Sequence, residues 1–135
     1  MKKIFVFLFL FISVTAKASE FCVENKVCYD IEIARTLEQK QKGLMFVKEL
    51  AKNKGMLFDV RGSENVSMWM KNTFIYLDML FIDCDYKVVD VYKRAKPLSL
   101  EHISSDKEFC FVLEVNGGDF DKYDLKIGDK FLFKK

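Results

Sequence analysis

The chain has 135 residues, of which 50% are hydrophobic and 31% are charged, with a formal net charge of +2. This length suits a single domain, and so high an apolar fraction excludes a disordered chain. One histidine excludes metal sites that need two or three imidazoles. Neither GxGxxG nor GxxxxGKS/T occurs, which excludes the common nucleotide-binding loops.

Residues 1–18 have the pattern of a secretory signal peptide. Lys2 and Lys3 precede an apolar run from Ile4 to Ile12, and Ala16-Lys17-Ala18 fits a cleavage site. The run is too short to span a membrane, which takes about 20 apolar residues. We therefore expect residues 19–135 to form one mature domain that is periplasmic or secreted and not stably inserted in a membrane. Cleavage after Ala18 would remove three lysines and leave the mature chain with 19 basic and 20 acidic residues. Nucleic acid is therefore not an expected partner.

Four cysteines remain in the mature chain, and an even number in an exported protein predicts two disulfides. Three pairings of Cys22, Cys28, Cys84 and Cys110 are possible. Cys22 and Cys28 flank a three-residue stretch that suits a hairpin loop and would place them opposite each other. The favoured pairing is therefore Cys22 with Cys28 and Cys84 with Cys110. A thiol metal site or a redox pair is the alternative, and no CxxC motif supports it.

The rest of the mature chain is predicted to consist mostly of short strands. Alternating or short apolar runs predict strands at residues 28–34, 55–60, 66–71, 77–83, 87–93, 108–115 and 130–134. Thr36 to Gln39 fits a capping box, which predicts a short helix ending near Gly43, and one helical turn is expected at 119–124. The fold class is mainly β with one or two short helices (α+β), as an antiparallel β-sandwich or a barrel-like single domain.

Several motifs resemble one known family. They are Lys42 to Phe46, Gly55 to Phe58, Trp69 to Thr73, Leu77-Asp78 before Phe81-Ile82-Asp83, Val112 to Val115 before Gly117, and Ile127-Gly128-Asp129. In order and spacing they resemble the domain of unknown function 192 (DUF192) family over about residues 29–133. Lys42, Val47 and Tyr76 stand where the family usually has Arg, Arg and Pro, so the resemblance carries over no anionic site built on those arginines. It implies a small, mostly β, often exported domain, and it brings no established activity.

The most concentrated aromatic and polar group is Trp69, Lys71 and Asn72, at the end of the predicted strand at 66–71. An indole can stack on a sugar ring or an organic cation, and a neighbouring amine and amide can hold polar groups. Together with Asp78 and Glu114, which lie in the family motifs, these residues form the predicted ligand-binding site. The alternative is structural, with Trp69 half-buried, Asn72 in a turn and Lys71 paired with Asp78 or Glu114.

Methionines suggest a second kind of site. Met68 and Met70 would place two thioethers on one side of the predicted strand, where Trp69 and His102 could assist Cu(I) binding. Methionine is also an adaptable core residue, so packing is the alternative, above all for Met45 and Met56. Apart from this possible copper site, no cofactor is predicted.

Catalysis has less support in the sequence. The one histidine, His102, has serines near it in sequence but lacks a recognisable nucleophile motif. The family motifs point to Asp78, Glu114 and Asp129 as candidates for carboxylate hydrolysis. The lysines at 40–42 and 134–135 are interpreted as solvated surface. The sequence therefore favours a non-enzymatic envelope domain that binds a small molecule or an envelope protein, with a copper-binding protein or a hydrolase as alternatives.

Overall fold

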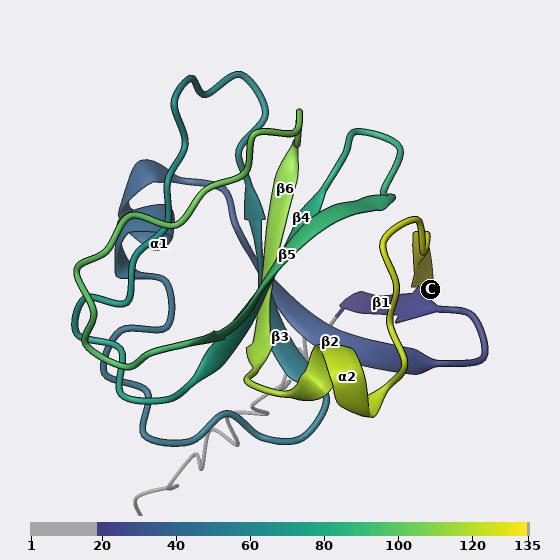
Figure 1. The fold of residues 1–135 in the computed structure, drawn as a ribbon, viewed down its shortest axis with the longest axis horizontal. Coiled ribbons are helices and arrows are strands. Elements are labelled where there is room, and N and C mark those ends of the chain that lie inside the picture. The colour runs from purple at the N-terminus through teal and green to yellow at the C-terminus, as the bar shows by residue number, and fades with distance from the viewer. Residues whose placement is uncertain (1–18, 135) are drawn as a thin grey trace, which may run out of the picture.

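A computed structural model describes residues 19–134, so the predicted signal peptide at 1–18 lies outside the described residues. The described part is a single domain of seven strands and two short helices (Figure 1). In chain order the elements are β1 (Ser19–Val23), β2 (Val27–Ala34), α1 (Leu37–Lys42), β3 (Lys54–Asp59), β4 (Leu77–Ile82), β5 (Val88–Ala95), β6 (Phe111–Asn116), α2 (Asp119–Lys122) and β7 (Phe131–Lys134). No helix within residues 19–134 is long and apolar enough to cross a membrane.

All seven strands belong to one sheet that curls into a half-barrel. Its order is β5-β4-β6-β3-β2-β1-β7, and every neighbouring pair is antiparallel except β2 with β3. The curl brings the two edge strands together: Lys87 and Lys130 form a bridge, and the Phe131 amide donates to the Tyr86 carbonyl at 2.9 Å. The predicted mainly β, barrel-like single domain is confirmed, and the parallel pair is a feature that the sequence analysis did not foresee.

The two faces of the sheet carry two separate apolar clusters. The barrel cluster lies within the curl, where strands from both edges and α2 meet, and includes Phe21, Tyr29, Leu113 and Phe131. The loop-side cluster includes Phe58, Met70, Met79, Phe81 and Val112. It lies on the side of the sheet where α1 and the long loops are seen in Figure 1. Because both faces are covered, the central strands β4 and β6 are buried at almost every position, which explains their continuous apolar sequences.

Helix α1 begins and ends as its sequence predicts. The Thr36 hydroxyl accepts a hydrogen bond from the Gln39 amide at 3.1 Å, and the Gln39 side chain accepts one from the Thr36 amide at 3.0 Å. This reciprocal pair is the predicted capping box. The helix ends at Gly43, whose φ of +47° lies in the region that glycine reaches without strain.

The predicted strand at 66–71 is wrong. This segment forms one isolated bridge, between Met68 and Ile103, and the Met70 amide then donates to the Ser99 carbonyl at 3.0 Å. The segment therefore pairs with another loop and not with the sheet. Its alternating apolar residues are explained by that packing, since Met70 reaches the loop-side cluster while Trp69 stays exposed.

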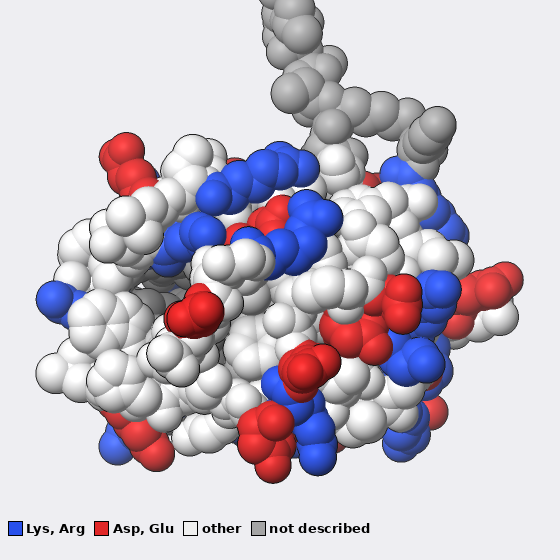
Figure 2. Space-filling model, turned by 90° about the horizontal axis from the view of Figure 1, so that it is seen from above, with Lys and Arg blue, Asp and Glu red and all other residues white. Residues whose placement is uncertain are grey.

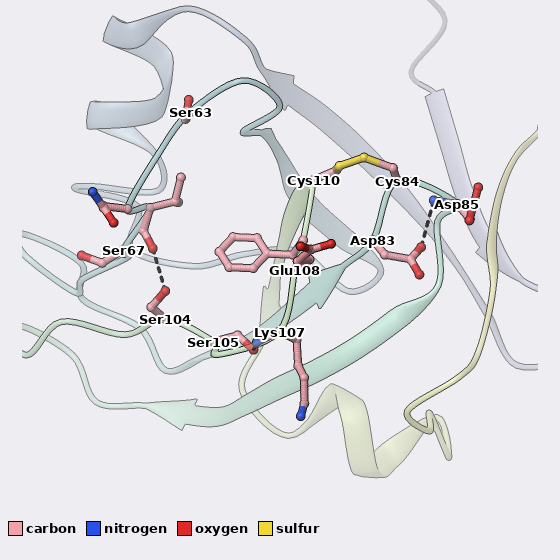
Figure 3. Close-up of a pocket in the computed structure, with 13 residues that line it drawn as sticks. Ser63, Ser67, Asp83, Cys84, Asp85, Ser104, Ser105, Lys107, Glu108 and Cys110 are labelled. Atoms are coloured by element: carbon pink, nitrogen blue, oxygen red, sulfur yellow. Dashed lines mark hydrogen bonds between the residues drawn. A yellow bond between two sulfur atoms is a disulfide. The ribbon is translucent and has the colours of Figure 1, made fainter.

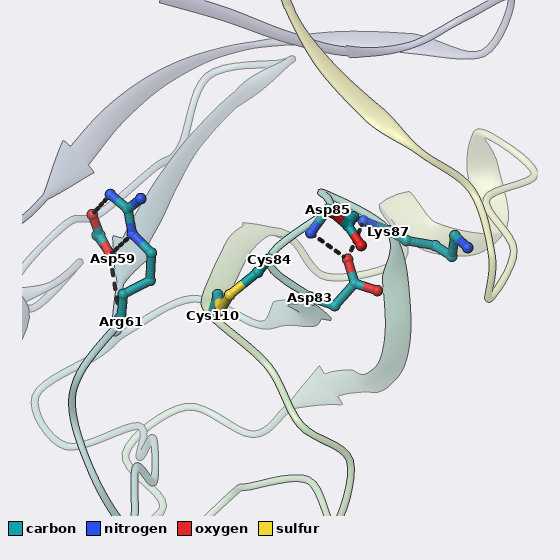
Figure 4. The surroundings of a disulfide bond; sticks show 7 residues. All are labelled: Asp59, Arg61, Asp83, Cys84, Asp85, Lys87 and Cys110. Carbon is teal, nitrogen blue, oxygen red and sulfur yellow. Dashed lines mark hydrogen bonds and ion pairs between the residues drawn. A yellow bond between two sulfur atoms is a disulfide. The ribbon is translucent and has the colours of Figure 1, made fainter.

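The cysteines pair as favoured. Cys22 and Cys28 face each other across the β1–β2 hairpin, whose loop contains Asn25 at a φ of 61°. Cys84 and Cys110 are also within disulfide-bonding distance, with their Cα atoms 5.1 Å apart. This second pair joins the turn after β4 to the residue that precedes β6, and it lies near the Asp83 turn (Figure 4).

Candidate functional site

A pocket of about 740 Å³ opens on the loop side of the sheet, between α1 and the loop that follows β3. We call it the Trp69 pocket. Helix α1 and the turn after it contribute residues 37, 38 and 40–45 to its lining. The loop contributes residues 63, 66–69, 71 and 73, and a second loop contributes His102. Phe58, Val60 and Glu114 line it from the sheet side. A volume of this size is in the range of sites for small organic ligands, which is about 300–1,000 Å³.

Trp69 and His102 form the outer aromatic part of the pocket. The indole is 41% exposed, and the His102 ring lies roughly parallel to it with a centroid separation of 6.5 Å. The Lys71 ammonium lies 5.1 Å from the indole centroid, within the range of a cation–π contact. The indole thus keeps an accessible surface beside a cation.

His102 also lies beside a hydroxyl. Its Nδ1 is 2.8 Å from the Ser67 Oγ, which is the distance expected between a nucleophile and its general base. Within residues 19–134, however, no carboxylate bonds to the other ring nitrogen, so the group that orients the imidazole in a catalytic triad is missing from the described chain.

Glu114 lies deep in the same pocket. It is in the middle of β6, opposite Met56 of β3 and Met79 of β4, on the same face as Val112. The residue is only 4% exposed, and within residues 19–134 its carboxyl makes no side-chain hydrogen bond or ion pair; because no described side-chain oxygen is both fully buried and unpartnered, the carboxyl oxygens keep some accessible surface in the pocket. Burial raises the pKa of Glu114 to about 8, so the carboxyl is uncharged at neutral pH and can both donate and accept a hydrogen bond.

The rim of the pocket is basic. Lys40, Lys42 and Lys71 line it, against a single exposed carboxylate, Glu38. Lys40 donates a hydrogen bond to the Asp59 carbonyl at 3.2 Å, which ties the end of α1 to the end of β3. Seen from above, several Lys and Arg side chains gather in one part of the surface with acidic atoms between them, and charges of both signs are also mixed elsewhere (Figure 2).

The structure brings together three of the five residues in the predicted ligand site. Trp69, Lys71 and Glu114 line the pocket, and Asn72 and Asp78 do not. Asn72 has a φ of 52°, and its carbonyl accepts the Phe46 amide at 2.8 Å, so it forms a turn that holds the chain after α1. The predicted pairing of Lys71 with Asp78 or Glu114 is not formed within the described residues.

Asp78 is a buried structural acid. It is 1% exposed and accepts hydrogen bonds from the backbone amides of Arg94 at 2.8 Å, Gly118 at 3.1 Å and Phe120 at 2.9 Å. It thereby joins the end of β5 to the turn between β6 and α2. The third carboxylate candidate, Asp129, pairs with Lys26 at 2.7 Å in another part of the fold. The three acids therefore do not form a common site.

The methionines that suggested copper differ in exposure. Met70 is fully buried in the loop-side cluster, and Met68 packs against that cluster and, like Met45, lines the Trp69 pocket. Within residues 19–134, one group of three His, Cys, Asp or Glu side chains is close enough to share a metal ion, namely Glu20, Cys22 and Cys28. The two sulfurs of that group form the first cysteine pair.

A second cavity, of about 840 Å³, lies beside the Cys84–Cys110 pair (Figure 3). Its polar groups largely satisfy one another. Ser104 donates to the Val66 carbonyl at 2.6 Å, Ser105 donates to Asp90 at 2.6 Å, and Asp83 accepts the amides of two residues in its own turn. The Trp69 pocket instead combines an accessible indole beside a cation with a carboxyl that makes no protein hydrogen bond within the described residues, so we place the candidate site there.

Sequence reasoning missed several residues of this pocket. Phe58 and Thr73 stood in the family motifs but were not proposed as site residues, and the lysines at 40 and 42 were interpreted as solvated surface. The capping box located α1, but no local signal shows which face of a six-residue helix turns toward a distant loop.

Together, the curled sheet and the loop-side pocket define a small β-rich domain with an open, partly apolar cavity beneath a basic rim. The DUF192 family model, described as Uncharacterized ACR, matches residues 20–133, so the chain belongs to the DUF192 family and the resemblance seen in the sequence is confirmed. No curated protein matches the chain.

Two solved structures are similar to this one. A protein of unknown function from Novosphingobium aromaticivorans DSM 12444 is 31% identical, with a TM-score of 0.78 over 85% of this chain and 83% of that chain. A putative transcription regulator from Sinorhizobium meliloti 1021 is 33% identical, with a TM-score of 0.77 over 85% of this chain and 91% of that chain. These similarities extend over most of each chain.

Proposed function

We propose that this protein is an exported, non-enzymatic domain of the cell envelope that binds a small organic ligand in the Trp69 pocket. The observation that carries the proposal is the Glu114 carboxyl, which makes no side-chain hydrogen bond or ion pair within residues 19–134 and opens into a cavity whose rim holds the exposed Trp69 indole. A hydrogen bond in a folded protein contributes a net free energy of about 0.5–1.5 kcal/mol. A ligand that hydrogen-bonds to Glu114 in this largely apolar cavity would gain that free energy.

The walls of the pocket support a binding role over a catalytic one. Leu44, Phe58 and Met68 offer an apolar surface, and the indole offers a flat one. Ser67 and His102 lie at the rim without an orienting carboxylate, as described above. The Sinorhizobium relative is titled a putative transcription regulator. We do not extend that role to this chain, because its residues 19–134 carry slightly more acidic than basic side chains.

Titration with N-phenyl-1-naphthylamine, a neutral dye that fluoresces in apolar sites, tests the binding proposal. We expect saturable binding with one site per chain and a change in Trp69 emission. Replacing Trp69 by Ala should weaken dye binding about five- to tenfold, since an aromatic contact contributes about 0.5–1.5 kcal/mol. The control is Leu132→Ala, which removes an exposed apolar side chain of β7 outside the pocket. Equal weakening in both variants, or no saturable binding, would contradict the proposal.

Export is supported by the pattern of residues 1–18 and by the two cysteine pairs, since disulfides persist outside the reducing cytosol. We expect intact mass spectrometry of the protein from its own cells to give a chain that begins at Ser19. Its mass should lack the four hydrogens that two disulfides remove. A full-length chain with four free thiols would refute this part of the proposal and would leave the ligand-binding part standing.

A further inference from the structure

We infer that the ligand of the Trp69 pocket is an amphiphilic organic anion, with a carboxylate or sulfonate group held at the lysine rim and an apolar body in the cavity. The inference rests on the proposed function and adds the charge and shape of the ligand. It follows from the uneven distribution of charged and apolar side chains around the cavity.

The charged groups of the pocket favour an anion. Three lysines, Lys40, Lys42 and Lys71, line the cavity together with one exposed acidic residue, Glu38, and the Lys40 ammonium also donates to the Asp59 carbonyl. They come from α1 and from the loop that faces it, so an anion at the mouth meets cations from both sides. At a half-exposed site such attractions are partly screened, and several cations act together more strongly than one surface pair.

The interior adds no negative charge at neutral pH. The groups that surround Glu114 from the neighbouring strands are Met56 and Met79, which carry no charge. Burial keeps the carboxyl protonated, so it can donate a hydrogen bond to an oxygen or accept one from a hydroxyl of the ligand. An ammonium ligand would have to pass three lysines and ionise this buried acid, whereas an anion with an apolar body requires neither.

The apolar walls define the other end of the ligand. Leu44 and Phe58 are buried, Met45 and Met68 are partly buried, and all four line the cavity with the indole of Trp69. A fully charged or polyhydroxylated ligand would lose its hydration against these side chains without replacement. Thioethers and rings adapt to alkyl or aromatic bodies of different shapes, which suits an amphiphile.

Competition with three ligands that share one carbon chain tests the inference. Octanoate, octanol and octylamine, at pH 7 and low salt, are each used to displace N-phenyl-1-naphthylamine from the full mature chain. We expect octanoate to displace the dye at concentrations about tenfold lower than either of the others, and this advantage should shrink with added salt.

Charge-removal variants localise the effect. Lys42→Gln with Lys71→Gln should weaken octanoate about tenfold and leave octanol unchanged. The matched control is Lys130→Gln with Lys134→Gln, which removes two exposed lysines outside the pocket and should change neither ligand. The inference of an anionic ligand would be overturned if octanol or octylamine displaced the dye at lower concentrations than octanoate. It would also be overturned if both double variants weakened octanoate binding equally. In either case the pocket would remain a binding site. No displacement by any of the three would overturn the inference about the ligand, whereas the proposed function itself is tested by saturable dye binding.

Discussion

Replacing Glu114 by Gln is expected to stabilise the domain by about 5 kcal/mol above pH 8 and to change its stability little below pH 4.5. The folded chain holds the Glu114 proton up to about pH 8, whereas the unfolded chain releases it near the ordinary pKa of 4.5. Between these values the folded state binds more protons, so the stability of the wild type falls as pH rises. Glutamine stays neutral and avoids this loss.

Urea unfolding of oxidised protein at pH 5, 7 and 9 measures the effect. The difference between Glu114→Gln and wild type should grow steadily across this series, and Glu24→Gln, at an exposed position of the β1–β2 loop, should show no such growth. Parallel curves for wild type and Glu114→Gln would mean that the carboxyl is solvated or paired, and the case for a ligand at Glu114 would then be lost. A steep pH dependence would show that the fold gives up stability to keep a neutral acid in the cavity.

Local signals in the sequence were enough for much of the fold. Apolar runs located β2 to β6, and the capping box located α1, because these features depend on residues close together in the chain. The hairpin spacing of Cys22 and Cys28 identified one cysteine pair and left the other by elimination. The parallel pairing of β2 with β3 depends on how the whole sheet curls, and nothing local encodes it.

The site was harder to predict for a related reason. Asp78 and Glu114 are both buried acids in apolar strands, and their sequence surroundings do not show where backbone amides will lie. Three backbone amides donate to Asp78, so this acid holds the fold together. The Glu114 carboxyl makes no side-chain hydrogen bond within residues 19–134, so it is a candidate for ligand binding. Likewise, the segment at 66–71 alternates like a strand, yet its partner is a loop that only the tertiary fold brings to it.

Replacing Asp78 by Ala is expected to destabilise the domain by about 5 kcal/mol, because each buried amide left without an acceptor costs about 1–3 kcal/mol. Three amides lose their acceptor, those of Arg94, Gly118 and Phe120. Gly118 adopts a φ of +98°, so the carboxylate also holds a turn that few other residues could form. Asp78→Asn should cost about half as much, since its oxygen can still accept two amides while its NH₂ group faces the third.

The control for Asp78 lies on α2, the short helix whose Phe120 amide donates to Asp78. Asp121→Ala removes an exposed acid that pairs with Lys93 at 2.8 Å, and an exposed pair of this kind contributes little to the free energy of unfolding. Urea unfolding should show a much larger loss of stability for Asp78→Ala than for Asp121→Ala. Dye binding should show whether Asp78 supports the fold or belongs to the ligand site. Folded Asp78→Asn should bind N-phenyl-1-naphthylamine with wild-type affinity, because Asp78 does not line the Trp69 pocket. If Asp78→Asn instead kept its stability and lost dye binding, Asp78 would belong to the ligand site and not to the framework that supports it.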